Sequence, residues 1–123
     1  MLKLGLVVLG VTDMGRAVTF WGEALGFAVR HGGADARWTE LGPPGQSEPV
    51  LALQYSDEPA EPHPRLHLDL WAEDAAEQRE QVERLVALGA ARVDWDSYPD
   101  DPDFVVLADP EGNRFCVVDC SHG

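Results

Sequence analysis

The chain has 123 residues, which is enough for one domain with a sizeable hydrophobic core. Its 45% hydrophobic and 25% charged residues are ordinary for a folded globular protein and exclude general disorder. Nine basic residues stand against 22 acidic ones, a formal net charge of −13, which excludes a phosphate-tracking nucleic-acid surface and disfavours anionic lipid. This acidity is explained most simply by solubility, and it also attracts cationic ligands.

The cellular location follows from the cysteines and the N-terminal segment. The two cysteines, Cys116 and Cys120, are too few for a secreted domain that depends on disulfides, and C-x3-C alone is not a zinc site. The apolar run at residues 4–11 is followed at once by charged residues, without the cleavage site of a signal peptide. No run approaches the roughly 20 apolar residues of a membrane span. We therefore predict a cytoplasmic protein with no membrane partner and no nucleic-acid partner.

The first half of the chain predicts a strand, a helix and three further strands. The continuous apolar run predicts a buried strand, and Asp13 then caps a helix whose apolar stripe is Met14, Ala17, Val18, Trp21 and Leu25. Gly26 is placed to end this helix. The four predicted strands cover residues 4–11, 27–31, 37–41 and 50–55.

The second half repeats this order after a segment rich in proline and acidic residues, 57–64, which reads as a linker. Residues 65–71 alternate, with Leu66, Leu68 and Leu70 on one face and His67, Asp69 and Trp71 on the other. Asp74 and Glu77 form a capping box for a second helix that ends at Gly89. The last predicted strands cover residues 91–95, 104–108 and 114–119, with an acidic loop at 96–103 and a turn at 109–113.

The residues that begin and end the predicted elements are similarly spaced in the two halves. The helix caps Asp13 and Asp74 are 61 residues apart, and so are Leu6 and His67. A ferredoxin-like βαββαβ order allows two strands between the helices, whereas four are predicted here. The sequence therefore predicts an α+β fold of two βαβββ modules in a single domain covering residues 1–123, with module one at 1–56, the linker at 57–64 and module two at 65–123.

Three segments resemble the vicinal oxygen chelate superfamily, the glyoxalase/bleomycin resistance/dioxygenase group, and most of all its small glyoxalase-like domains. They are residues 11–27, the strand His67-Leu68-Asp69-Leu70, and the turn Asp109-Pro110-Glu111-Gly112-Asn113 with Arg114-Phe115. The resemblance covers nearly the whole chain. It implies two modules forming a curved mixed β-sheet around a ligand cup, with helices on the outside, often completed by a second subunit. We therefore predict a homodimer.

The resemblance also allows a test for a metal. Catalytic members of the superfamily hold a divalent ion with His, Gln or Glu from the first and fourth strands of each module. Their positions correspond here to Leu6, to Leu53 or Gln54, to His67 and to Cys116. Leucine offers no lone pair, and a thiol in place of a carboxylate suits soft ions, unlike the hard ions of such enzymes. We therefore predict no metal and no cofactor.

Candidate ligand contacts come from the strand faces that the resemblance turns toward the cup. They are Trp38, Gln54, His67, Asp69, Trp71 and Cys116. Structural roles are also open to them: His67 bonded to a neighbour, Asp69 paired with Arg114, and Cys116 as an apolar filler. Trp38 and Trp95 flank loops, where each either packs in a core or dimer contact or lines a cavity mouth. No catalytic residue is identified.

These features predict a small-molecule binding protein of the glyoxalase/bleomycin-resistance type. It would sequester a small neutral or cationic ligand in the cup without a conventional metal site. The alternative is a metal-dependent lyase or isomerase, or a dioxygenase-like enzyme, acting on a small metabolite. A third possibility is a structural or regulatory dimer whose cup is filled by its own side chains.

Overall fold

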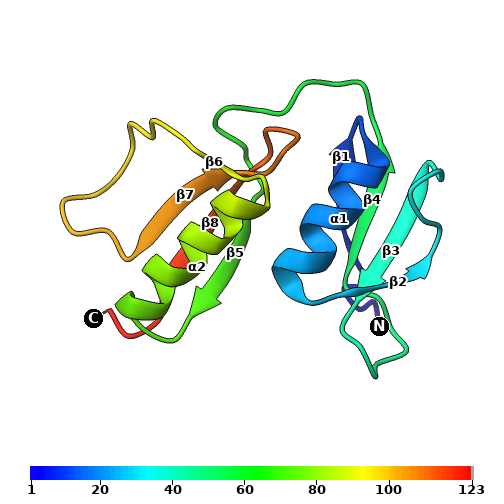
Figure 1. Cartoon of the computed structure of the whole chain (residues 1–123), viewed down its shortest axis with the longest axis horizontal. Coiled ribbons are helices and arrows are strands. Elements are labelled where there is room, and N and C mark those ends of the chain that lie inside the picture. The colour runs from blue at the N-terminus through cyan, green and yellow to red at the C-terminus, as the bar shows by residue number, and fades with distance from the viewer. Residues whose placement is uncertain (123) are drawn as a thin grey trace. The chain divides into compact units, whose positions relative to one another are not determined.

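A computed structural model describes residues 1–122, and the chain divides into two compact units, Met1–Pro59 and the part that begins at Ala60 (Figure 1). Each unit contains one helix and four strands in the order βαβββ. The predicted α+β class and the two similar modules are thus confirmed, and that the two modules make one domain stays a prediction. Among the described residues, no helix is long and apolar enough to cross a membrane.

The first unit holds a mixed four-stranded sheet in the order β1-β4-β3-β2, with β1 parallel to β4 and the other pairs antiparallel. Its elements are β1 (Val7–Val11), α1 (Met14–Leu25), β2 (Ala28–His31), β3 (Trp38–Gly42) and β4 (Leu51–Tyr55). The first strand begins later than the predicted residue 4, because its ladder with β4 begins where Val7 meets Leu51.

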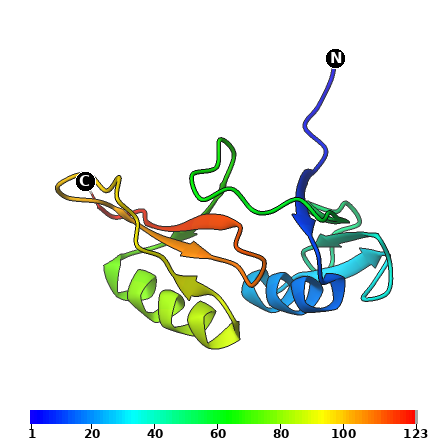
Figure 2. The same cartoon turned by 90° about the horizontal axis from the view of Figure 1, so that it is seen from above.

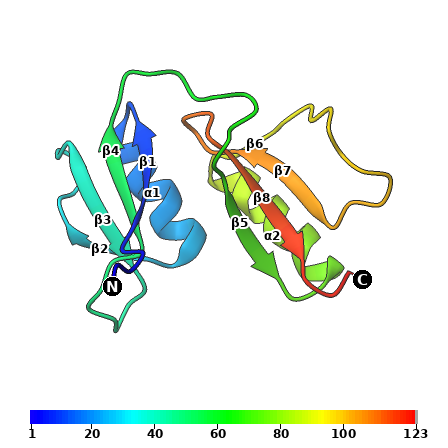
Figure 3. The ribbon, with the colours of Figure 1, turned by 180° about the vertical axis from the view of Figure 1, so that it is seen from behind.

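The second unit repeats this plan in the order β5-β8-β7-β6, with β5 parallel to β8 (Figure 3). Its elements are β5 (Leu68–Ala72), α2 (Ala75–Leu88), β6 (Ala91–Arg92), β7 (Phe104–Ala108) and β8 (Arg114–Asp119). The chain thus forms two sheets, one in each unit, and each is mixed as predicted.

Both helices begin and end where the sequence predicts. The carboxylate of Asp13 accepts a hydrogen bond from the Arg16 amide at 3.1 Å, and that of Asp74 accepts one from the Glu77 amide at 2.8 Å. Gly26 ends α1 in the left-handed region, with φ of 66°, which glycine adopts without steric cost. The capping-box glutamate, Glu77, accepts from the amide of Glu73, one residue earlier than the usual pattern.

The predicted turn before the last strand is held by one buried carboxylate. Asp109 Oδ1 accepts hydrogen bonds from the amides of Glu111 at 2.9 Å and Asn113 at 2.8 Å. Gly112, with φ of 91°, donates its amide to the Asp109 carbonyl. This local network fixes where β8 starts. It explains why the turn needs an aspartate at position 109 and a glycine at position 112.

Each helix covers one face of the sheet in its own unit (Figure 2). The buried face of α1 differs slightly from the predicted stripe, because Phe20 and Ala24 are buried whereas Val18 and Leu25 are only partly so. In α2 the buried residues are Val82 and Leu85. Among the described residues, no helix of the second unit covers the opposite face of its sheet, and this face forms the candidate site.

Two strands of the second unit are displaced from their predicted bounds. The predicted strand 91–95 shortens to β6, because the chain leaves the sheet after Arg92. Beyond that point the Val106 amide donates to the Tyr98 hydroxyl at 2.7 Å, so a side chain supplies the acceptor in place of a strand. The predicted strand 65–71 starts only at Leu68, and Leu66 is 73% exposed rather than on an inner face.

We predict that Gln78 is the main polar link between α2 and the sheet. Its Nε2 donates to the carbonyls of Asp103 and Val117, both at 3.0 Å. Replacing Gln78 with Met leaves both acceptors without this donor and is expected to lower the free energy of unfolding by about 1–3 kcal/mol. Urea denaturation measures this change. The matched variant Gln46→Met, at an exposed loop position of the first unit, should change the stability little, and equal losses in both would contradict the assignment.

Candidate functional site

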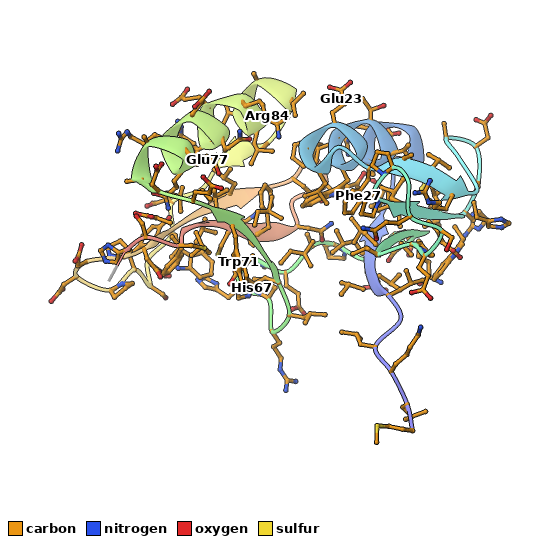
Figure 4. All side chains as sticks on the ribbon, turned by 90° about the horizontal axis from the view of Figure 1, so that it is seen from below. Glu23, Phe27, His67, Trp71, Glu77 and Arg84 are labelled. Atoms are coloured by element: carbon orange, nitrogen blue, oxygen red, sulfur yellow. The ribbon has the colours of Figure 1, made fainter. Side chains whose placement is uncertain are left out.

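The candidate site lies on the face of the second sheet that points away from α2. Figure 4 shows His67 and Trp71 on this side of β5. The strand register brings Asp69 opposite Cys116 on β8, and Cys116 opposite Val106 on β7. Because side chains alternate along a strand, these neighbours share one face. The register alone therefore gathers an acid, a thiol and an aliphatic side chain beside His67.

Three of these side chains form a compact polar cluster. His67 Nε2 lies 3.1 Å from Asp69 Oδ1, and the donor atoms of His67, Asp69 and Cys116 all lie within 4.8 Å of one another. The thiol of Cys116 hydrogen bonds to the Asp69 carboxylate. Asp69 therefore bridges an imidazole and a thiol. Arg114, suggested by the sequence as a partner of Asp69, instead donates its Nη1 to the Gly112 carbonyl at 2.9 Å.

The cluster keeps its thiol protonated. Burial raises the pKa of the Cys116 thiol from 9.0 to about 11, and the Asp69 charge, the hydrogen bond to Asp69 and the Asp103 charge act in the same direction. Only a thiolate is an effective nucleophile. Cys116 is therefore a hydrogen-bond donor to Asp69 at neutral pH rather than a nucleophile, whereas the sequence alone suggested an apolar filler.

A pocket of about 430 Å³ opens over this cluster, within the usual range for small-molecule sites. Among the described residues that line it, none is a lysine or an arginine, and apolar and aromatic side chains predominate. We call it the module-two pocket; its lining residues are Pro64, His67, Asp69, Trp95, Ser97, Asp103, Phe104, Val106, Cys116 and Val118.

Aromatic contacts hold the pocket wall that is formed by Trp95, in the loop between β6 and β7, and by Phe104. The imidazole of His63 stacks on the Trp95 ring with 4.9 Å between centroids, and its Nε2 lies 3.0 Å from Asp96 Oδ1. This hydrogen bond is the largest of the effects that lower the pKa of Asp96. On the other side of the loop the Tyr98 ring packs on Phe104 at 5.2 Å. Both aromatic walls are thus positioned by neighbouring rings.

The other predicted contacts lie elsewhere. Trp71 shares the face of His67 but is 81% exposed, and it does not line the module-two pocket. Trp38 and Gln54 are register partners on β3 and β4 of the first unit, and the Trp38 indole donates to Glu40 at 2.8 Å. Their role in ligand contact stays a prediction.

Several pocket residues were not singled out as ligand contacts from the sequence. Phe104 and Val106 alternate along β7, which could have placed them on one face with Cys116. Trp95 was noted as either a packing residue or a cavity-mouth residue, and it lines the pocket. Ser97 and Asp103 lie in an irregular loop whose sequence carries no periodicity, so nothing in the sequence indicates which of its side chains turn toward the sheet.

The superfamily's metal positions do not fit the residues present. The offset of 61 residues equates Val7 with Leu68, whose partners in register are Leu51 and Phe115. The residues that correspond to His67, Asp69 and Cys116 in the first unit are therefore Leu6, Val8 and Ala52, none of which offers a donor atom. By this register the counterpart of Cys116 is Ala52, whereas the sequence alone placed it near Leu53 or Gln54. The donor set for a hard divalent ion is thus incomplete.

Comparison with known proteins identifies the family. Residues 6–118 match the model of the glyoxalase-like domain, and the chain belongs to this family. None of the curated proteins matches the sequence significantly.

Solved structures share the fold. A glyoxalase-related enzyme from Fulvimarina pelagi is 19% identical, with a TM-score of 0.70 over 96% of this chain and 88% of its own. TnmS3, an antibiotic binding protein from Streptomyces sp. CB03234, is 24% identical, with a TM-score of 0.58 over 96% and 95%. A lactoylglutathione lyase from Agrobacterium tumefaciens is 21% identical, with a TM-score of 0.61 over 94% and 92%. At these identities the likeness establishes the fold alone.

We predict that the two thiols differ strongly in reactivity. Two units of pKa make the thiolate fraction of Cys116 about one hundredfold smaller than that of an unperturbed thiol at pH 8, and Cys120 is exposed. Iodoacetamide should therefore label Cys120 much faster, as followed by peptide mass spectrometry. Asp69→Asn removes a charge and an acceptor that raise the pKa and should accelerate labelling of Cys116. An unchanged Cys116 rate in this variant, beside an unchanged rate in Asp100→Asn, would contradict the hydrogen-bonded cluster.

Proposed function

We propose that this protein binds a small neutral or cationic molecule in the module-two pocket and sequesters it without catalysing a reaction. The observation that carries this proposal is the pocket itself, which combines apolar walls with a few convergent polar groups. The negative charge of its polar groups and of the chain disfavours an anion. One structural neighbour is described as an antibiotic binding protein, which is compatible with this role.

The principal alternative is a metal-dependent lyase or isomerase, or a dioxygenase-like enzyme. It is less well supported, because the first unit offers Leu6 and Ala52 where the superfamily's ligands would belong. The protonated thiol of Cys116 is a further obstacle to a hard-ion site. The likeness to a lactoylglutathione lyase does not reverse this balance, since a shared fold does not fix the reaction.

A blocked pocket should abolish ligand stabilisation. Ser97 is exposed at the pocket edge, so Ser97→Trp is expected to fill the pocket without disturbing the core. A ligand at one hundred times its Kd stabilises the native state by about 2.7 kcal/mol, which corresponds to a rise in Tm of roughly several degrees. In a thermal-shift screen of neutral, cationic and anionic compounds, hits should raise the Tm of the wild type and not that of Ser97→Trp.

The matched control is Ser47→Trp, an equally exposed serine in the first unit, which should respond like the wild type. If no compound in a broad screen separates the two variants, the binding proposal is wrong and a structural or regulatory dimer becomes the better interpretation.

Elemental analysis tests the metal-dependent alternative. Protein purified without chelator and without a His-tag should contain no stoichiometric Mg²⁺, Mn²⁺, Ni²⁺ or Zn²⁺, because His67 alone of the superfamily's standard ligands is present. Stoichiometric metal that is lost in His67→Ala would overturn this prediction and favour the enzyme.

The predicted homodimer and cytoplasmic location belong to the same proposal. The two β-sheets have edge strands, β1 and β2 in the first unit and β5 and β6 in the second, and such edges tend to be paired or covered. Light scattering at micromolar concentration is expected to report twice the mass of the chain, and a monomer would contradict the dimer.

A further inference from the structure

Asp69 has room for another hydrogen-bond donor. An ionised carboxylate can accept about four hydrogen bonds. The contacts described for Asp69 are those with His67 and Cys116, and its side chain remains 47% exposed toward the module-two pocket. Arg114, the nearby cation suggested by the sequence, donates to a backbone carbonyl instead. The carboxylate is therefore available to a positively charged donor that enters the pocket.

A second carboxylate, Asp103, lines the same pocket and is firmly anchored through its backbone. Its carbonyl accepts hydrogen bonds from Gln78 Nε2 at 3.0 Å and from the Asp119 amide at 2.7 Å. The charges of Asp69 and Asp103 both act on the Cys116 thiol, where they add to the effect of burial in raising its pKa. The negative potential of the two acids is thus felt at Cys116, which lines the pocket.

The walls suit a flat apolar body. Trp95 and Phe104 face the pocket from the loop and from β7, and each ring is packed against a second ring outside it, His63 and Tyr98 respectively. Aromatic faces also attract cations. Because these rings are already held in place, a ligand loses little binding energy in ordering them.

We propose that the module-two pocket is a site for an organic cation, in which an amidinium or ammonium group donates hydrogen bonds to Asp69 while its apolar body lies against Trp95 and Phe104. This inference rests on the proposed binding function and narrows it to one ligand class. The cation would bind beside His67 and Cys116, two positions that the resemblance assigns to metal ligands.

A metal ion makes poorer use of this arrangement. His67, Asp69 and Cys116 resemble a zinc donor set, but the thiol must lose its proton to bind, and burial together with the neighbouring acids raises its pKa. A lone ion would also fill only a small part of a 430 Å³ pocket and would make no contact with most of its aromatic walls. An amidinium, by contrast, offers planar paired N–H groups to a carboxylate and leaves the thiol protonated.

The test uses three probes of one shape and different charge: benzamidine, benzamide and benzoate. Calorimetric titration in 0.15 M salt should show benzamidine binding at least about tenfold more tightly than benzamide, with benzoate weakest. Asp69→Asn and Asp103→Asn should each weaken benzamidine binding severalfold or more. Asp100→Asn removes the same charge from an exposed position on the same loop and should leave binding unchanged. Circular dichroism verifies that each variant is folded.

The outcomes separate this inference from the proposed function. If benzamidine does not bind, or binds no better than benzamide, the organic-cation site is wrong, while the thermal-shift screen with Ser97→Trp still decides whether the pocket binds small molecules at all. Equal losses in Asp69→Asn and Asp100→Asn would reduce the effect to general attraction by net charge and would also overturn the site. Stoichiometric Zn²⁺ that is released in Cys116→Ala would assign the cluster to a metal instead.

Discussion

The carboxylate of Asp69 is the group on which the account of this protein depends. It lies on the face of the second sheet that α2 does not cover, close to the imidazole of His67 and the thiol of Cys116. A charge in such a place needs hydrogen-bonding partners or water. The partners found here are an imidazole and a thiol, and the carboxylate also faces a pocket with aromatic walls. The charge of this carboxylate and the shape of the pocket both support the proposed cationic ligand.

The two units share one arrangement of strands and helix but differ in the side chains at corresponding positions. Their strand orders and registers correspond, and the same type of cap begins each helix. Yet the three polar residues of the second unit have the apolar counterparts Leu6, Val8 and Ala52 in the first. A metal site that needs ligands from both modules would lack the side-chain donors of the first module here. What remains is a polar cluster within one module, which suits hydrogen bonding to an organic ligand better than coordination.

The sequence predicted most of the fold because its strongest signals are local. Asp13, Gly26 and Asp74 act within one helical turn, and the turn at residues 109–113 is closed by its own aspartate. Strand ends were less accurate, because they depend on the partner strand. The predicted strand 91–95 shortened to two residues where the Tyr98 hydroxyl takes over the hydrogen bond of a neighbouring strand.

For the site, alternation along one strand was sufficient to group His67 with Asp69, and strand register then added Cys116. The contributions of Trp95, Ser97 and Asp103 depend on the path of an irregular loop, which distant contacts such as the His63 stack determine. Sequence patterns do not encode such contacts. Alternation places Trp71 on the same face as His67, but it does not show that this side chain is largely exposed.

An NMR titration of the ¹⁵N-labelled protein with benzamidine tests the organic-cation site, because it reports where a cation binds as well as whether it binds. We expect saturable shifts of the amides of Asp69, Cys116 and Phe104 and of the Trp95 indole, with much smaller shifts for benzoate. Shifts confined to Met1–Pro59, or small shifts scattered over the acidic surface without saturation, would contradict it.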